Sequence, residues 1–200
     1  MKELTPEKIV ENWDKFRQLC SKVGERSSSV LKMVDELEDR LSICPASAKV
    51  EHHLPFPGGL IDHSIRTLTN ALTIWKTFFP GADSVTKESI VLVSLMHDLG
   101  KCGDERGNDF YVPQASQWHV DRGENYTYNR NIQYMPHAHR SVYLLQRYGI
   151  RLSDEEFIAI LTHDGTFAEE NKPYSMKEPT LGVIVSMADY IATVQEKSLD

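Results

Sequence analysis

The chain has 200 residues, of which 40% are hydrophobic and 26% are charged, and its formal net charge is −7. This composition is ordinary for one globular domain, and no apolar run approaches the ~20 residues needed to span a bilayer. The excess of acidic residues disfavours indiscriminate binding to a nucleic-acid backbone, so we expect a small substrate rather than a long nucleic acid.

The first part of the chain predicts two helices. Thr5 followed by Pro6 is typical of a helix start, and apolar residues recur at helical spacing from there to Cys20. The same spacing predicts a second helix that runs from Val30 to Leu41.

The helical pattern continues through the middle of the chain. Pro45 is expected to open a short helical piece before the loop sequence HHLPFPGG. A further helix is predicted over residues 60–79. Thr86 is a suitable cap for the next helix, which is expected to stop at Gly100.

The segment 103–134 differs in character, because it is polar and aromatic with weak alternation. It predicts a loop or a small β-hairpin inserted between helices. Helices then follow from Pro136 to near Gly149, from a capping box at Ser153 as far as His163, and over about 179–196.

Together these elements predict an all-α helical bundle with the insert near 103–134. We expect N-terminal helices within residues 1–44 to pack on a domain of residues 45–200, so that the whole chain forms one globular unit. The three dispersed cysteines favour free thiols in a reducing compartment, and the polar N-terminus is not that of a signal peptide. We therefore expect a cytoplasmic protein.

Six histidine and aspartate residues are candidates for one metal site. They are His63, His97, Asp98, His137, His163 and Asp189. Imidazole and carboxylate ligands suit a hydrolytic or oxygen-activating metal rather than a cysteine-rich structural zinc site. Asp189 interrupts an apolar helical stretch, where an unpaired carboxylate would be costly. Each residue has an ordinary structural explanation, but a shared metal site accounts for all six at once.

The same residues carry a family resemblance. The sequence GGLIDHSIRT around His63, the sequence HDLGK that begins at His97, and the later aspartate resemble the signature of the HD-domain superfamily of metal-dependent phosphohydrolases. The stretch PHAHRSVYLLQRYGIRLSDEEFIAILTHDG resembles the branch of that superfamily with two added histidines. His137 fits the first added position better than His139 does, and the resemblance covers about positions 50–195.

The resemblance implies two divalent metal ions, with Mn or Fe preferred over Zn, Co or Mg. His63, His97, Asp98 and Asp189 would hold the first ion. Asp98 would also bridge to a second ion, which His137 and His163 complete. A hydroxide that bridges the two ions would act as the nucleophile.

Several further residues are candidates for contacts with the substrate. Lys101 follows the doublet and can neutralise charge that develops on a phosphoryl group, although a solvated lysine at a helix end is an equally good explanation. Arg66 and Arg140 are weaker candidates. Asp164, which replaces a second histidine of some relatives, can be a base, a ligand or the cap of a turn. Trp118 can stack on a base or simply pack the insert onto the domain.

The implied activity is that of a phosphomonoesterase or phosphodiesterase acting on a nucleotide or a related small phosphorylated molecule. An end-trimming nuclease is disfavoured by the acidic composition. A di-iron oxygenase of the same superfamily, cleaving C–C or C–P bonds, is the main alternative, because the same ligands accommodate iron. A regulatory module with a degenerate site is disfavoured, since no expected ligand is missing. The sequence does not predict an oligomeric state.

Overall fold

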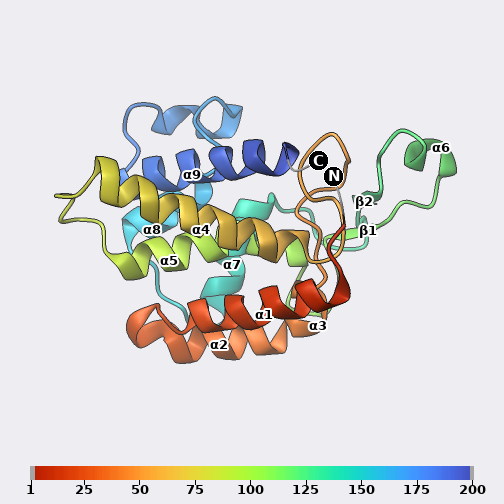
Figure 1. The fold of residues 1–200 in the computed structure, drawn as a ribbon, viewed down its shortest axis with the longest axis horizontal. Coiled ribbons are helices and arrows are strands. Elements are labelled where there is room, and N and C mark those ends of the chain that lie inside the picture. Colours follow the sequence, from red (N-terminus) through yellow and green to blue (C-terminus); the bar gives the residue numbers. More distant parts are fainter. Residues whose placement is uncertain (1–2, 199–200) are drawn as a thin grey trace.

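The computed structural model describes residues 3–198 and is helical, with one antiparallel two-stranded hairpin (Figure 1). The elements are α1 (Pro6–Cys20), η1 (Gly24–Arg26), α2 (Ser27–Glu36), α3 (Glu38–Leu41), α4 (Gly59–Phe78), α5 (Lys87–Met96), η2 (Leu99–Cys102), β1 (Tyr111–Pro113), α6 (Gln117–Val120), β2 (Tyr126–Tyr128), α7 (His137–Arg147), α8 (Asp154–Leu161), η3 (Glu169–Tyr174) and α9 (Thr180–Lys197). The all-α fold with a small hairpin is confirmed. Within residues 3–198, no helix is both long enough and apolar enough to cross a membrane.

Helices α4 and α9 form the centre of the fold and lie side by side (Figure 1). Helix α5 packs on α4, and α8 packs on α9. Every residue of α5 from Ile90 to Met96 is buried, so this helix is surrounded by its neighbours. Helix α7 packs on η2, the short turn that follows α5. This packing brings the end of α5 against the start of α7.

Helices α1 and α2 cover another side of the centre. Thr5 caps α1 by accepting a hydrogen bond from the backbone N–H of Lys8 at 3.3 Å, and Pro6 occupies the first helical position. Trp13 and Phe16 of α1 are buried in the hydrophobic core that α4 and α5 also line. The N-terminal helices therefore share one core with the rest of the chain.

Two predicted elements differ from the structure. The helix expected from Val30 to Leu41 is divided at Leu37, where α2 ends and α3 begins. The helical piece expected at Pro45 is wrong, because residues 45–58 are irregular. Some of their backbone groups bond to the insert: the carbonyl of Ala48 accepts from the N–H of Tyr126 at 3.1 Å.

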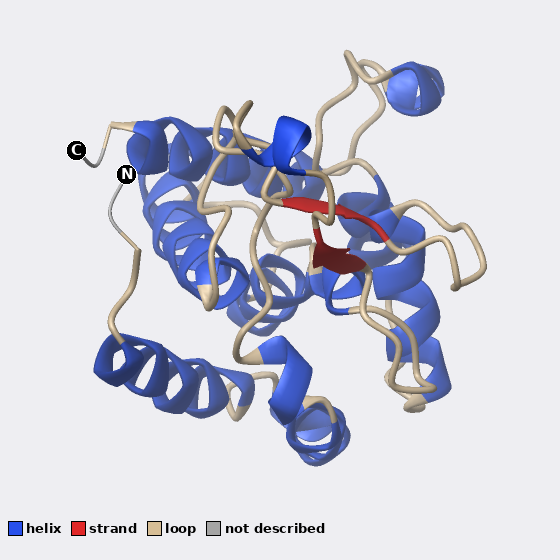
Figure 2. Ribbon diagram, turned by 90° about the vertical axis from the view of Figure 1, so that its right-hand side faces the viewer, coloured by secondary structure: helices blue, strands red, loops and turns tan. Residues whose placement is uncertain are grey.

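The insert is a hairpin that carries a short helix at its tip (Figure 2). Strands β1 and β2 pair antiparallel, with Tyr111 opposite Tyr128. The ring of Phe110 makes edge contacts with both tyrosines, at centroid distances of 4.8 and 4.7 Å. Aromatic packing thus anchors the base of the hairpin, while α6 projects away from the helical body (Figure 1).

Candidate metal centre

The structure brings all six predicted metal ligands together from distant parts of the chain. His63 lies on α4, His97 and Asp98 lie between α5 and η2, His137 begins α7, His163 follows α8, and Asp189 lies on α9. The meeting point is where the end of α5 faces α4, α7, α8 and α9. Several elements must therefore be packed correctly before this group exists.

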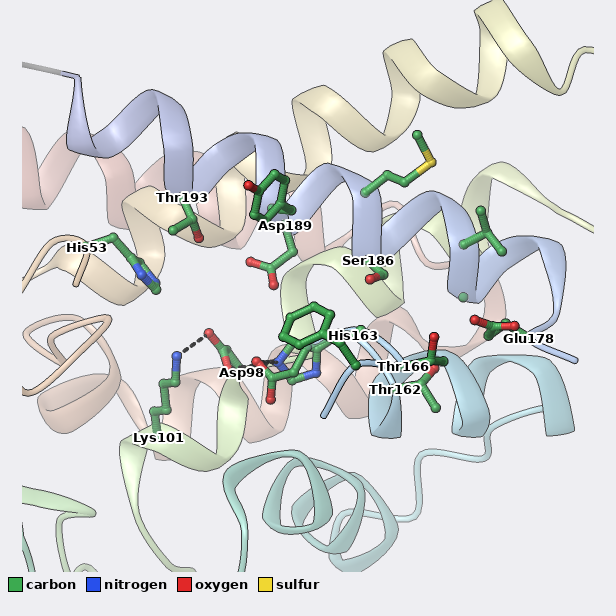
Figure 3. A pocket seen from close by; sticks show the side chains of 17 residues that line it. His53, Asp98, Lys101, Thr162, His163, Thr166, Glu178, Ser186, Asp189 and Thr193 are labelled. Carbon is green, nitrogen blue, oxygen red and sulfur yellow. Dashed lines mark hydrogen bonds and ion pairs between the residues drawn. The ribbon is translucent and has the colours of Figure 1, made fainter. Parts of the chain in front are cut away.

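His63, His97 and Asp189 form a first group. Nε2 of His63 lies 3.3 Å from Nε2 of His97 and 2.9 Å from Oδ1 of Asp189. One ligand atom from each of the three lies within 4.8 Å of the others. Figure 3 shows Asp189 reaching from α9 toward Asp98 and His163, which lie on the opposite wall.

His137 and His163 form a second group, with their Nε2 atoms 3.3 Å apart. Oδ1 of Asp98 lies 3.3 Å from Nε2 of His137 and 3.4 Å from Nε2 of His163. The other oxygen, Oδ2, lies 3.5 Å from Nε2 of His97 and 3.8 Å from Nε2 of His63. Asp98 therefore presents one carboxylate oxygen to each histidine pair.

Backbone carbonyls fix the proton position on two of these rings. Nδ1 of His97 lies 2.9 Å from the carbonyl oxygen of Ser94, and Nδ1 of His163 lies 2.7 Å from that of Ile160. Because a carbonyl only accepts, each Nδ1 carries the hydrogen. Each Nε2 is then left with a lone pair directed into the centre, as a metal ligand requires.

A buried carboxylate fixes the proton position on the ring of His63. Nδ1 of this ring lies 3.1 Å from both carboxylate oxygens of Glu196, whose side chain is fully buried. Glu196 was not among the residues predicted from the sequence. A signal was present, because Glu196 follows Asp189 by seven positions and so shares its helix face.

The geometry leaves an unmet need for a cation. Oδ1 of Asp98 is buried and accepts no hydrogen bond within the described part of the chain. Nε2 of His63 and Nε2 of His97 also lie 3.3 Å apart, close enough for both to bind one cation. A buried carboxylate oxygen needs hydrogen bonds or a cation. The residues therefore fit a divalent metal ion in chemistry and in arrangement.

The pKa values of the centre also indicate that it suits a cation. Burial alone would lower the pKa of His63, but the carboxylates of Asp189 and Glu196 outweigh it and raise that pKa to about 10. Burial would raise the pKa of Asp189, but the hydrogen bond from His63 lowers it to about 2. Burial dominates at His97 and lowers its pKa to about 4. The centre thus keeps its carboxylates ionised and favours positive charge.

Lys101 lies beside the centre. Its Nζ is 2.6 Å from Oδ2 of Asp98, and its side chain is buried (Figure 3). Burial would lower the pKa of Lys101, but the charge of Asp98 outweighs it and raises that pKa above its usual range. The lysine is therefore a charged group held at the edge of the metal centre, rather than a solvated one.

Asp164 and His53 are further possible metal ligands beside the six predicted ones. Oδ2 of Asp164 lies 3.3 Å from Nε2 of His137, and with His163 these residues form a further set of possible ligands. His53 forms another such set with His63 and Asp98. Its ring is 4.6 Å from that of His63, and burial lowers its pKa to about 2. His53 was not among the predicted ligands, whereas Asp164 was a candidate.

The two predicted arginines lie outside the cavities that adjoin the centre. Nη2 of Arg66 bonds Oδ2 of Asp62 at 2.8 Å, and its Nε faces Glu196 at 3.4 Å. Arg140 is buried and donates to the carbonyl of Gln133 at 2.6 Å. Neither side chain lines either cavity, and contact of these arginines with substrate stays a prediction.

Trp118 is also far from the centre. It lies on α6 with 57% of its surface exposed, and the guanidinium of Arg122 lies 3.8 Å from the centre of its ring. It lines neither cavity. The structure gives no support to stacking of Trp118 on a bound base.

A cavity of about 730 Å³ opens onto the centre. Asp98, Lys101, His163 and Asp189 are among its lining residues, and it continues along one face of α9 (Figure 3). This volume lies within the usual range for sites that bind small molecules.

Comparison with known proteins adds one finding. A family model described as HD domain matches residues 60–194, which include His63 at one end and Asp189 near the other. Neither a search of curated proteins nor a search of solved structures found a match.

Proposed function

Because the chain belongs to the HD-domain family, whose members are metal-dependent hydrolases, we propose that it hydrolyses phosphate esters. The match covers well over half of the chain and includes every residue of the two histidine groups. The substrate we propose is a nucleotide or a related small phosphorylated molecule.

The position of Asp98 carries this proposal. One of its oxygens faces His97 and His63, while the other faces His137 and His163. A carboxylate that faces two ligand groups suits a pair of cations that share an anion. We therefore propose two divalent ions, with Mn or Fe as the first choices.

When bound, the ions would acidify a water molecule and polarise the phosphoryl oxygens. The protein's own side chains orient this chemistry. Ser94 and Ile160, through their carbonyls, and Glu196, through its carboxylate, hold the histidine rings with Nε2 directed inward. Lys101 keeps a positive charge at the cavity wall, where it can neutralise charge that develops on the phosphoryl group.

The test is phosphate-ester hydrolysis by purified protein loaded with Mn²⁺ or Fe²⁺, followed by separating substrate from product, across nucleoside monophosphates, triphosphates and cyclic phosphates. We expect Asp98→Ala to reduce turnover by at least ~10³-fold while the helical circular dichroism is retained, because both ligand groups lose their shared anion. Asp35→Ala is the matched control, since Asp35 pairs with Arg17 on the surface far from the centre. The control variant should keep full activity.

Two results would contradict the proposal. One is an Asp98→Ala variant that retains most of the activity with unchanged metal content. The other is substrate-dependent oxygen uptake without phosphate-ester hydrolysis by the iron-loaded protein, which would indicate the oxygenase alternative.

A further inference from the structure

Two cavities meet beside the second histidine pair. The larger one, described above, includes His163, and a smaller one of about 340 Å³ includes His137. Asp164 lines both. The segment after Asp164 divides them, because Gly165 lines the larger cavity and Asn171 lines the smaller one. The side chain of Asn171 donates to the carbonyl of Gly165 at 3.0 Å and closes this dividing loop.

The smaller cavity is aromatic. Phe110, Tyr111, Tyr128 and Tyr134 of the insert line it, facing the start of α7. The hydroxyl of Tyr128 is buried and has no hydrogen-bond partner within residues 3–198. Aromatic walls favour a flat ring, and a buried hydroxyl without a partner favours a ligand that can hydrogen-bond with it.

The larger cavity has an apolar wall of a different kind. Val183, Met187 and Tyr190 line it from α9, and their spacing places them on one helix face. Phe167 lines it from the dividing loop. Ser186 also faces the cavity from α9 and adds a hydroxyl (Figure 3). This wall suits an apolar group that makes few hydrogen bonds.

Neither cavity offers free positive charge from its side chains. Among the described residues that line them, Lys101 is the one lysine or arginine, and it is bound to Asp98. Carboxylates are present in both, with Glu178 in the larger cavity and Glu170 in the smaller. A polyphosphate chain would meet no lysine or arginine other than Lys101 among these lining residues, so a substrate with a single negative charge fits better.

We propose that the substrate is a phosphodiester whose two organic groups occupy the two cavities, an aromatic group in the smaller and an apolar group in the larger. This inference rests on the proposed phosphoester hydrolysis. A monoester has one organic group and would leave one cavity unused, whereas a diester fills both and carries one negative charge. In the reaction, the oxygen of water bonds to phosphorus and the P–O bond to one group breaks. That group leaves as an alcohol or phenol with a proton from the water, and the other stays on a phosphomonoester.

The experiment compares bis(4-nitrophenyl) phosphate with 4-nitrophenyl phosphate in Mn²⁺-loaded protein, following release of nitrophenol. Tyr134→Ala removes a wall of the smaller cavity and Met187→Ala a wall of the larger; both side chains are exposed, at 70% and 46%, so the fold should persist. For the diester we expect each substitution to raise KM by roughly 5–10-fold with little change in kcat, because aromatic and apolar contacts of this kind carry about that much binding. For the monoester, at most one substitution should act.

Trp118→Ala is the control, since Trp118 is an exposed aromatic residue of the same insert that lines neither cavity. It should leave both KM values unchanged. ATP should be hydrolysed at least ~10-fold less efficiently than the diester, for want of cationic side chains.

The inference is overturned, while the proposed function stands, if the monoester is the better substrate or if one of the two cavity substitutions leaves the diester's KM unchanged. It is also overturned if Trp118→Ala raises that KM as much as the cavity substitutions do. If no phosphate ester is hydrolysed at all, the proposed function fails and the inference fails with it.

Discussion

Gly100 lies in close contact with the backbone of α7, and its replacement tests how the metal centre is held together. A Cβ atom at Gly100 would lie 2.1 Å from the carbonyl oxygen of His137 and 2.8 Å from the backbone N of Ser141. These are backbone atoms, which cannot swing aside as a flexible side chain can. Since ordinary contacts begin near ~3.5 Å, α7 would have to retreat by about 1 Å or more.

The displaced groups include hydrogen bonds that join the two elements. The hydroxyl of Ser141 accepts from the N–H of Gly100 at 2.8 Å and donates to the carbonyl of His97 at 2.8 Å. Overpacking costs about 1–3 kcal/mol, and weakening these buried bonds adds about 1 kcal/mol. We therefore expect Gly100→Ala to lower the free energy of unfolding by about 2–4 kcal/mol, which corresponds to a fall in Tm of roughly 5–15 °C.

Activity should fall as well, because His137 would move with α7 away from Asp98. A misplacement of about 1 Å can cost ~10²-fold in rate. Thermal unfolding and turnover should be measured beside Gly81→Ala, where a Cβ would meet no atom within 4 Å. A Gly100→Ala protein whose Tm lies within about 2 °C of the control and whose turnover is undiminished would refute this steric account.

Two further predictions concern the second histidine pair and a buried ion pair. His137→Ala should lose one bound metal ion and His139→Ala none, because His137 contacts His163 while the side chain of His139 is exposed. Metal analysis of both variants tests this. The reverse result would assign the ligand role to His139. Glu156→Gln should lower stability by about 2 kcal/mol at pH 7, since Arg26 loses the buried carboxylate with which it pairs. Burial would raise the pKa of Glu156, but the hydrogen bond from Arg26 holds it below its usual 4.5. The contribution is therefore complete above pH 4.5 and is lost as the pH falls through the lowered value, so the Tm difference between the two proteins should shrink on acidification. A Tm difference that is independent of pH would contradict this assignment.

Helix starts were predictable because their signals are local. Thr86 caps α5 by accepting from the backbone N–H of Ser89, and Ser153 and Glu156 form both halves of the capping box at α8. Each of these interactions joins residues three positions apart, so the sequence contains all the information that determines them. The same holds for the approximate extent of the insert, where aromatic and polar residues interrupt the helical period.

Other features depend on contacts that no local pattern encodes. Glu196 contacts His63 across 133 positions of the chain, and the local sequence around it predicts only a charged helix end. Arg66 was expected near the substrate, but Asp62 and Glu196 occupy its guanidinium. The segment after Pro45 had a helical signal, yet its backbone groups pair with the insert. In each case the tertiary fold supplied a partner that decided the outcome.

The insert over residues 103–134 supplies none of the six candidate metal ligands, yet four of its aromatic side chains form a wall of the smaller cavity. The proposed selection of an aromatic group is thus assigned to a stretch of polypeptide that is separate from the metal ligands. Lengthening, shortening or exchanging this hairpin can retune which compounds are accepted without disturbing the reactive machinery. Such a division of labour gives the scaffold an easy route to diversify, and it marks the hairpin as the place to begin redesign.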